Sequence, residues 1–152
     1  MPSDHTAREI IEVMLLRTSK AIMENDFAAM NACFALPLLL ETKETELIIT
    51  TEQEHREMFD RLVEGYVCKG VTDIIRVCEV AEFIEPNVIR SLHISHIMAG
   101  DQRVDDPLPT IATTELFDDG WRITAAQYAA TRNVPVGRAM AVRANLPRVE
   151  NV

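Results

Sequence analysis

The sequence predicts an α+β domain in which three N-terminal helices pack on one face of a strongly curved antiparallel sheet. Two observations support this prediction. The first 70 residues contain two helix-start signatures, each followed by apolar residues at helical spacing. From Val71 onward the apolar pattern changes to a period of two, which is typical of strands. Helices grouped before strands indicate the α+β class, and a long twisted meander must curl around helices that pack on one side of it.

The first predicted helix runs from about Ala7 to Glu24. Thr6, followed three residues later by Glu9, forms a capping box, which is typical of a helix start. Seven residues behind it fall on one helical face: Ile10, Ile11, Met14, Leu15, Thr18, Ala21 and Ile22. Three more apolar residues lie off this stripe, namely Val13, Leu16 and Met23. We therefore expect the helix to be covered on a second side as well.

A short second helix is predicted from Phe27 to Phe34, and Pro37 is expected to stop it because proline cannot continue a helix. Two short extended runs follow, Leu38–Thr42 and Thr45–Thr50, on either side of a polar turn. This pattern predicts a small hairpin between the second and third helices.

The third predicted helix begins after a second capping box, formed by Thr51 and Glu54. Its apolar residues share one face: Met58, Phe59, Leu62, Val63 and Tyr66. The helix is expected to end at Gly65, and the chain is expected to turn away from it at Gly70, because glycine is common just past a helix.

Four strands are predicted after the third helix: Val71–Ile84, Val88–Met98, Thr110–Phe117 and Trp121–Tyr128. A polar loop joins the second of these strands to the third. Asp119-Gly120 joins the last two, because this pair supplies the positive φ angles of a tight hairpin turn. The chain after residue 130 gives no clear pattern.

The chain has 152 residues, the length of one domain. We divide it into a globular domain, residues 1–130, and a basic tail, residues 131–152. The tail contains four arginines and one glutamate, so its charge is +3 and the remaining residues carry −12. This contrast indicates a tail that lies back on its own domain or on a partner, and a solvated tail is the alternative.

Charge and composition disfavour several classes of protein. A net charge of −9 repels phosphate backbones and anionic lipids, and an aromatic content of 5% offers little stacking surface for bases. Three isolated cysteines, Cys33, Cys68 and Cys78, fit buried thiols in a reducing compartment better than disulfides or zinc. The polar start and the short apolar run at 36–40 predict neither a leader nor a membrane span. We expect a soluble, cytoplasmic protein that binds no metal, cofactor, nucleic acid or membrane.

The order of these elements resembles the nuclear transport factor 2-like proteins, a family that includes the SnoaL-like polyketide cyclases and the ketosteroid isomerases. The likeness covers roughly residues 5–130. It rests on the capped first helix, the short helix that leads into Pro37-Leu38-Leu39-Leu40, and the final hairpin with Asp119-Gly120-Trp121-Arg122-Ile123. The resemblance implies a cone in which a bent sheet wraps helices and leaves a pocket at its open end. It also implies a homodimer that pairs through the outer face of the sheet.

Three polar residues are candidates for catalysis in such a pocket. His55 and Tyr66 share the apolar stripe of the third helix with Phe59 and Leu62, so an imidazole base and a phenol donor can face the sheet. The alternative for His55 is a solvent-exposed position at the start of the helix. The alternative for Tyr66 is a ring that packs on the core with its hydroxyl group in solvent. Glu41 lies near the place of the catalytic aspartate that the resemblance implies, but Glu41-Thr42 replaces the Asp-Pro pair of those isomerases. An exposed hairpin position is the alternative for Glu41.

His93 and His96 are three residues apart on one strand, so they point to opposite faces and do not form a metal pair. The face that carries His96 is the more apolar, which favours it as the inner face, although the assignment can invert. The residues predicted to line the pocket are Met14, Phe59, Leu62, His96 and Trp121. Arg76 is predicted to be solvated or to lie in an interface.

We expect a binder of a small apolar or amphipathic molecule, with a cofactor-independent isomerase, dehydratase or cyclase activity as its catalytic form. A non-catalytic dimerisation or protein-interaction module is the alternative. The cone-like order of elements motivates the first hypothesis, and the charge contrast of the tail motivates the second.

Overall fold

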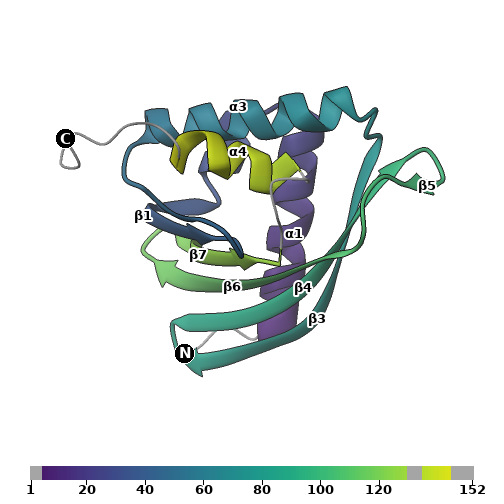
Figure 1. Ribbon diagram of the computed structural model, residues 1–152. Helices are drawn as coiled ribbons and strands as arrows, with labels where there is room; N and C mark the ends of the chain where they lie inside the picture. The colour runs from purple at the N-terminus through teal and green to yellow at the C-terminus, as the bar shows by residue number, and fades with distance from the viewer. Residues whose placement is uncertain (1–4, 130–134, 145–152) are drawn as a thin grey trace, which may run out of the picture.

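The computed structural model describes residues 5–129 and 135–144. The helices in this part of the chain are α1 (Ala7–Met23), α2 (Phe27–Asn31), α3 (Glu52–Cys68) and α4 (Pro135–Ala144). The strands are β1 (Phe34–Glu41), β2 (Glu46–Ile49), β3 (Asp73–Glu85), β4 (Val88–Ala99), β5 (Gln102–Arg103), β6 (Leu108–Phe117) and β7 (Gly120–Tyr128). The α+β class, the three N-terminal helices and the strongly curved sheet are confirmed (Figure 1). No helix in the described ranges is long and apolar enough to cross a membrane.

Both predicted capping boxes form. The Thr6 and Thr51 hydroxyls accept hydrogen bonds from the backbone N–H groups of Glu9 and Glu54, each at 3.1 Å, and both glutamates bond back to the cap. Gly65 does not end α3, because the helix continues to Cys68 and the chain turns out at Gly70, where φ is +68°. Glycine fits inside the helix at Gly65 because Pro135 packs closely against it. A Cβ atom at this position would lie only 3.1 Å from the Cβ of Pro135.

The second helix is shorter than predicted, and the following strand begins earlier. Helix α2 ends at Asn31, and β1 starts at Phe34 and passes through Pro37. The register between β1 and β7 shifts between Phe34 and Leu39. Proline is tolerated there because an irregular stretch of ladder does not require its missing N–H. Pro37, which was predicted to stop the second helix, lies inside the strand.

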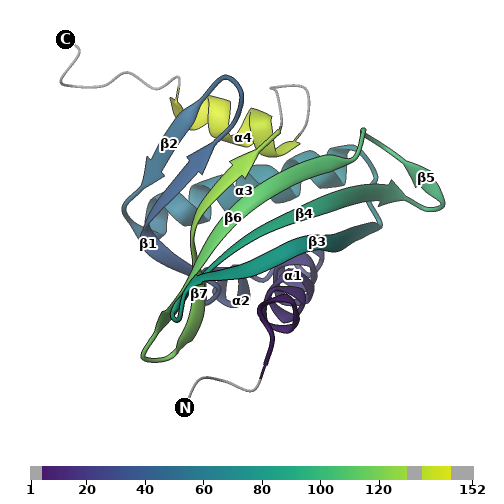
Figure 2. The same ribbon diagram turned by 90° about the horizontal axis from the view of Figure 1, so that it is seen from below.

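The sheet has the strand order β2-β1-β7-β6-β4-β3, and β5 pairs with β4 (Figure 2). The pairs within the predicted meander are antiparallel, but β1 runs parallel to β7. The predicted antiparallel meander is confirmed, and the sheet also contains one parallel pair, which the sequence did not predict. Strands β1 and β7 are far apart in sequence, and only the curl of the sheet brings them side by side.

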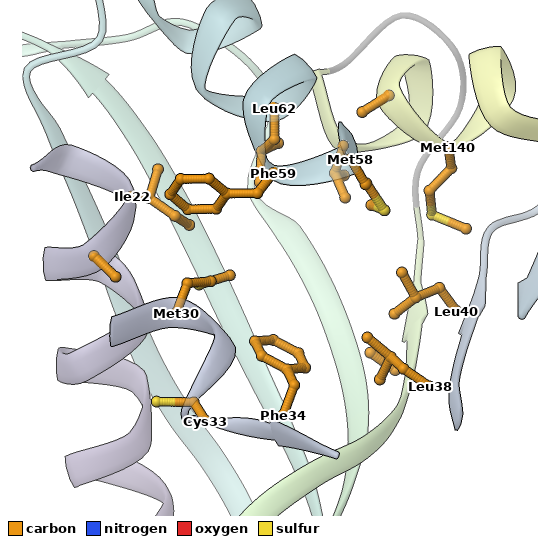
Figure 3. Close-up of a cluster of buried hydrophobic side chains, with 14 of the residues drawn as sticks. Ile22, Met30, Cys33, Phe34, Leu38, Leu40, Met58, Phe59, Leu62 and Met140 are labelled. Atoms are coloured by element: carbon orange, nitrogen blue, oxygen red, sulfur yellow. The ribbon is translucent and has the colours of Figure 1, made fainter. Parts of the chain in front are cut away.

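The main core lies between the helices and the concave face of the sheet. It joins side chains from α1, α2, α3, β1 and α4, among them Ile22, Met30, Phe59, Leu38 and Met140 (Figure 3). A smaller cluster fixes α1 against β3 and β4 and contains Ala7, Ile11, Leu15, Cys78 and Ile89. These two clusters hold the helices at the positions from which they reach the space above the sheet.

Helix α4 lies in the region that the sequence left unassigned. It runs beside α3 (Figure 1), and Val136, Ala139 and Met140 join the main core with at most 5% of each residue exposed. Arg61 of α3 donates from Nε to the Ala139 carbonyl at 3.3 Å. The other residues of the predicted tail, 131–134 and 145–152, lie outside the described residues.

Candidate functional site

A hollow of about 60 Å³ lies between the concave face of the sheet and the helices, with room for a few water molecules. We call it the sheet cavity. The helices line it with Leu15, Thr18, Ile22, Met30, Leu62, Tyr66 and Val136. The polar lining of the strands consists of Arg76, His93, Ser95, Thr110 and Tyr128. The cavity therefore has mainly apolar helical walls and a polar patch on the sheet.

Strand register explains how the polar patch forms. His93 of β4 pairs with Thr110 of β6, and Thr110 pairs with Tyr128 of β7. Arg76 of β3 pairs with Ser95 of β4, one step along the same face. Side chains of paired residues point to the same side of a sheet, with Cβ atoms about 5 Å apart. Residues distant in sequence are thus placed in two adjacent rows.

Arg76 is the fixed positive charge of this patch. Its Nη1 donates to the Thr18 hydroxyl at 2.7 Å, and its buried Nε has no hydrogen-bond partner among the described residues. In the same part of the chain, no carboxylate lies within ion-pair distance of the guanidinium. The prediction that Arg76 is solvated or interfacial was wrong, because its strand face points toward α1.

The inner histidine of β4 is His93, and the preference for His96 was wrong. His93 is 7% exposed, whereas His96 is half-buried and its Nδ1 lies 3.2 Å from Nη2 of Arg103. The prediction rested on the more apolar face of the strand being the inner one. On β4 the convex face carries the apolar Leu92 and Ile94, while the concave face carries the polar His93 and Ser95 at the cavity.

Burial sets the protonation of the cavity's titratable side chains. It lowers the pKa of His93 to about 3, with a smaller contribution from the positive charge of Arg76, and Nδ1 has no partner in the described chain. Burial raises the pKa of Tyr66 to about 12, and it also raises that of Tyr128. At neutral pH the imidazole is therefore uncharged and both phenols keep their protons.

A second hollow has a volume of about 30 Å³. Four residues line both this hollow and the sheet cavity and lie between them: Met30, Phe34, Leu62 and Tyr128. We call the second hollow the His55 cavity. Nδ1 of His55 lies 2.9 Å from Oδ1 of Asn31, and Asn31 donates from Nδ2 to Glu52 at 2.9 Å. An amide that donates to Glu52 presents its oxygen to the ring, so His55 donates from Nδ1–H and its Nε2 is the acceptor. Burial lowers the pKa of His55 to about 4.

Several solved structures share this arrangement of helices around a curled sheet. A domain of unknown function with a cystatin-like fold from Nostoc punctiforme has a TM-score of 0.67 at 15% identity, over 91% of this chain and 85% of that one. A function-unknown protein from Mycobacterium tuberculosis reaches 0.65 at 14% identity, over 90% and 87%. A proposed dehydratase of the NTF2-like family from Streptomyces avermitilis reaches 0.60 at 9% identity, over 82% and 95%. The chain has the nuclear transport factor 2-like fold. No protein-family model and no curated protein matches the sequence.

In this nuclear transport factor 2-like fold, the three predicted catalytic residues do not come together. His55 lines one cavity and Tyr66 the other, and eleven residues of helix place their Cα atoms about 16 Å apart. Glu41 lines neither cavity, and its carboxylate accepts a hydrogen bond from Gln127 at 3.3 Å on the surface. The geometry therefore offers no joint site for these three side chains.

The predicted lining residues are divided between different hollows. Phe59 lines the His55 cavity, and Leu62 lines both cavities. Met14 and Trp121 line neither, but border a surface groove of about 560 Å³ beside α1. His96 lies on the convex side. The sequence thus placed the α3 residues at the cavities and misplaced those whose position depends on how the sheet curls.

No pattern in the sequence predicted that four residues form one polar group in the cavity: Arg76, His93, Thr110 and Tyr128. Alternation along each strand shows that Ile74, Arg76 and Cys78 share a face, but not which face is inward. The missing information is the register between β3, β4, β6 and β7, because it aligns these polar groups and is set by tertiary contacts.

Proposed function

We propose that this protein binds a small amphipathic molecule in the sheet cavity. The observation that carries this proposal is a set of buried polar atoms without partners in the described chain: Nε of Arg76, Nδ1 of His93 and the Thr110 hydroxyl. A buried polar group that is left unpaired costs about 1–3 kcal/mol. A ligand with a polar end would supply these hydrogen bonds, and its apolar part would contact Leu15, Ile22 and the other helical walls.

The cavities as they stand are small, so the size of the ligand depends on the side chains between them. The partition consists of Met30, Phe34, Leu62 and Tyr128. Methionine and leucine change rotamer within a core at low cost relative to movement of the backbone. We expect a ligand to displace the side chains of Met30 and Leu62 and to occupy both spaces as one elongated pocket.

Binding fits the protonation of the site better than proton-transfer catalysis. An efficient general acid or base has a pKa near the working pH. His93, with a pKa of about 3, and Tyr66, with a pKa of about 12, are far from that range. These groups serve as fixed hydrogen-bonding partners, so we rank ligand binding above an isomerase, dehydratase or cyclase reaction.

Mass spectrometry of the purified protein tests the proposal. We expect native spectra to show a small-molecule adduct that is released on denaturation. Ala126→Leu, whose side chain would enter the sheet cavity, is expected to remove the adduct, whereas Ala125→Leu points to the convex face and is expected to retain it. An adduct retained in Ala126→Leu, or a cavity that takes up no compound when apolar acids and alcohols are added, would contradict binding at this site.

We also propose that the convex face pairs two copies of the chain. Six apolar residues form a band on that face: Ile75, Val77, Val80, Leu92, Ile94 and Ile111. Ile75 is 46% exposed and Ile111 is 40% exposed. A contiguous apolar patch on an ordered sheet is typical of a protein interface, and a twofold axis lets one patch cover its own copy.

Light scattering coupled to size-exclusion chromatography measures the pairing. We expect a dimer for the unmodified chain and a monomer for Val77→Lys, because an unpaired charge in the centre of an apolar interface opposes association. Leu16→Lys, on an exposed position of α1, is the control and should remain dimeric. A monomeric unmodified chain would rule out the proposed interface.

We propose that the protein is cytoplasmic. The supporting observation is that Cys33, Cys68 and Cys78 are all free thiols, which a reducing compartment maintains.

A further inference from the structure

We infer that the ligand of the sheet cavity is a carboxylic acid whose carboxylate binds beside Arg76. This inference rests on the proposed binding function and specifies the chemical class of the ligand. It follows from the charge of the cavity, from the hydrogen-bond donors around that charge, and from the apolar walls beyond it.

No carboxylate of the described residues forms an ion pair with Arg76. The guanidinium carries a fixed positive charge, and its hydrogen-bond partner in the described chain is the neutral hydroxyl of Thr18. Asp105, a carboxylate near Tyr66, is already bound to Lys69 at 2.8 Å. A partly buried charge without a counter-charge is costly, so an anion at this point would be stabilised.

The groups around Arg76 match a planar acid better than other anions. Its unpartnered Nε and its terminal nitrogens form a fork that can bind both oxygens of a carboxylate. The Thr110 hydroxyl has no partner in the described chain, and Tyr128 keeps its phenolic proton, so each offers a hydrogen-bond donor to a group bound in the cavity that both line with Arg76. The single guanidinium also matches the single charge of a monocarboxylate.

The cavity must recognise this acid locally, because the whole molecule repels it. The net charge of the chain is −9, so the long-range field disfavours an anion relative to a neutral compound of the same shape. A preference for the acid would therefore come from contacts inside the cavity.

Isothermal titration of matched compounds tests the inference on the unmodified protein. We would compare straight-chain and phenyl-substituted carboxylates with the corresponding primary alcohols and amines. We expect each acid that enters the cavity to bind at least about tenfold more tightly than its alcohol, since hydrogen bonds to charged groups are stronger than neutral ones. The amines should bind more weakly than the alcohols.

Two arginine variants test whether the preference for acids comes from Arg76. Arg76→Met removes the charge and keeps an apolar side chain of similar length, so it should abolish the preference for acids while the alcohols still bind. Arg90→Met removes the same charge from an exposed position on the convex face and should keep the full preference. The comparison of acids with alcohols on the unmodified chain remains valid even if Arg76→Met does not fold.

The outcomes separate the inference from the proposed function. Equal affinity for acids and alcohols would overturn the carboxylate inference and leave ligand binding in place. An acid preference that persists in Arg76→Met would overturn the assignment to Arg76. If neither acids nor alcohols bind and no adduct is found, both the proposed function and the inference fail.

Discussion

Lowering the pH from 6.5 to 4 is expected to remove several kcal/mol of folding stability, because two buried histidines resist protonation in the folded protein. His55 and His93 are buried in the folded protein with pKa values of about 4 and about 3, against 6.5 for an unperturbed histidine. Between these values the unfolded chain binds protons that the folded protein does not, so stability falls as the pH falls. At pH 4 the penalty is on the order of 3 kcal/mol for each ring.

Urea unfolding at a series of pH values measures this loss. His55→Gln and His93→Gln should each flatten the dependence between pH 6.5 and pH 4, and the double variant should nearly abolish it. His96→Gln, on the convex side of the same strand as His93, is the control for the substitution itself and should follow the unmodified chain. Carboxyl groups with a lowered pKa, such as that of Glu9, lose their own contribution as the pH falls through and below 4.5, and this loss is common to the variants and the unmodified chain. The same slope in the double variant and the unmodified chain would contradict the role of the two rings.

Met140→Ala is expected to lower the free energy of unfolding by about 2–5 kcal/mol, the usual cost of truncating a fully buried methionine. Met140 is 0% exposed, and its side chain points from α4 toward Met58 and Leu40 (Figure 3). The lost contacts and the cavity left behind both contribute. The effect would establish that α4 is part of the cooperative core although it follows the last strand of the meander.

Chemical denaturation of three proteins gives this measurement: the unmodified chain, Met140→Ala, and Met23→Ala as a control. Met23 is 38% exposed at the end of α1, so the same substitution there should cost much less. Equal losses at both positions, or no loss at Met140, would show that α4 does not pack stably on α3.

Local sequence signals predicted the elements whose ends are determined by neighbouring residues. Thr6 and Thr51 cap their helices through residues three positions away, so the starts of α1 and α3 were visible without any tertiary information. The stripe of α3 likewise placed His55, Phe59, Leu62 and Tyr66 on its buried face. The curved sheet followed from the long meander and its turn residues.

Other features depended on contacts between distant segments. Helix α4 has a weak local pattern and is held by the groove beside Gly65 and by the core around Met140. Strand β1 continues through Pro37 because its partner β7 is irregular in register at that point. Neither feature is visible in a short window of sequence, since the stabilising partner is far along the chain.

The candidate site shows the same division most clearly. Residue types and strand periodicity determined that His93 and His96 face opposite ways, and that Arg76 shares a face with Ile74. Which face is concave was decided only by the tertiary structure. Alternation fixes the relative orientation of side chains along one strand, whereas the inner side is chosen by the helices that pack there and by the register that aligns Arg76, His93, Thr110 and Tyr128.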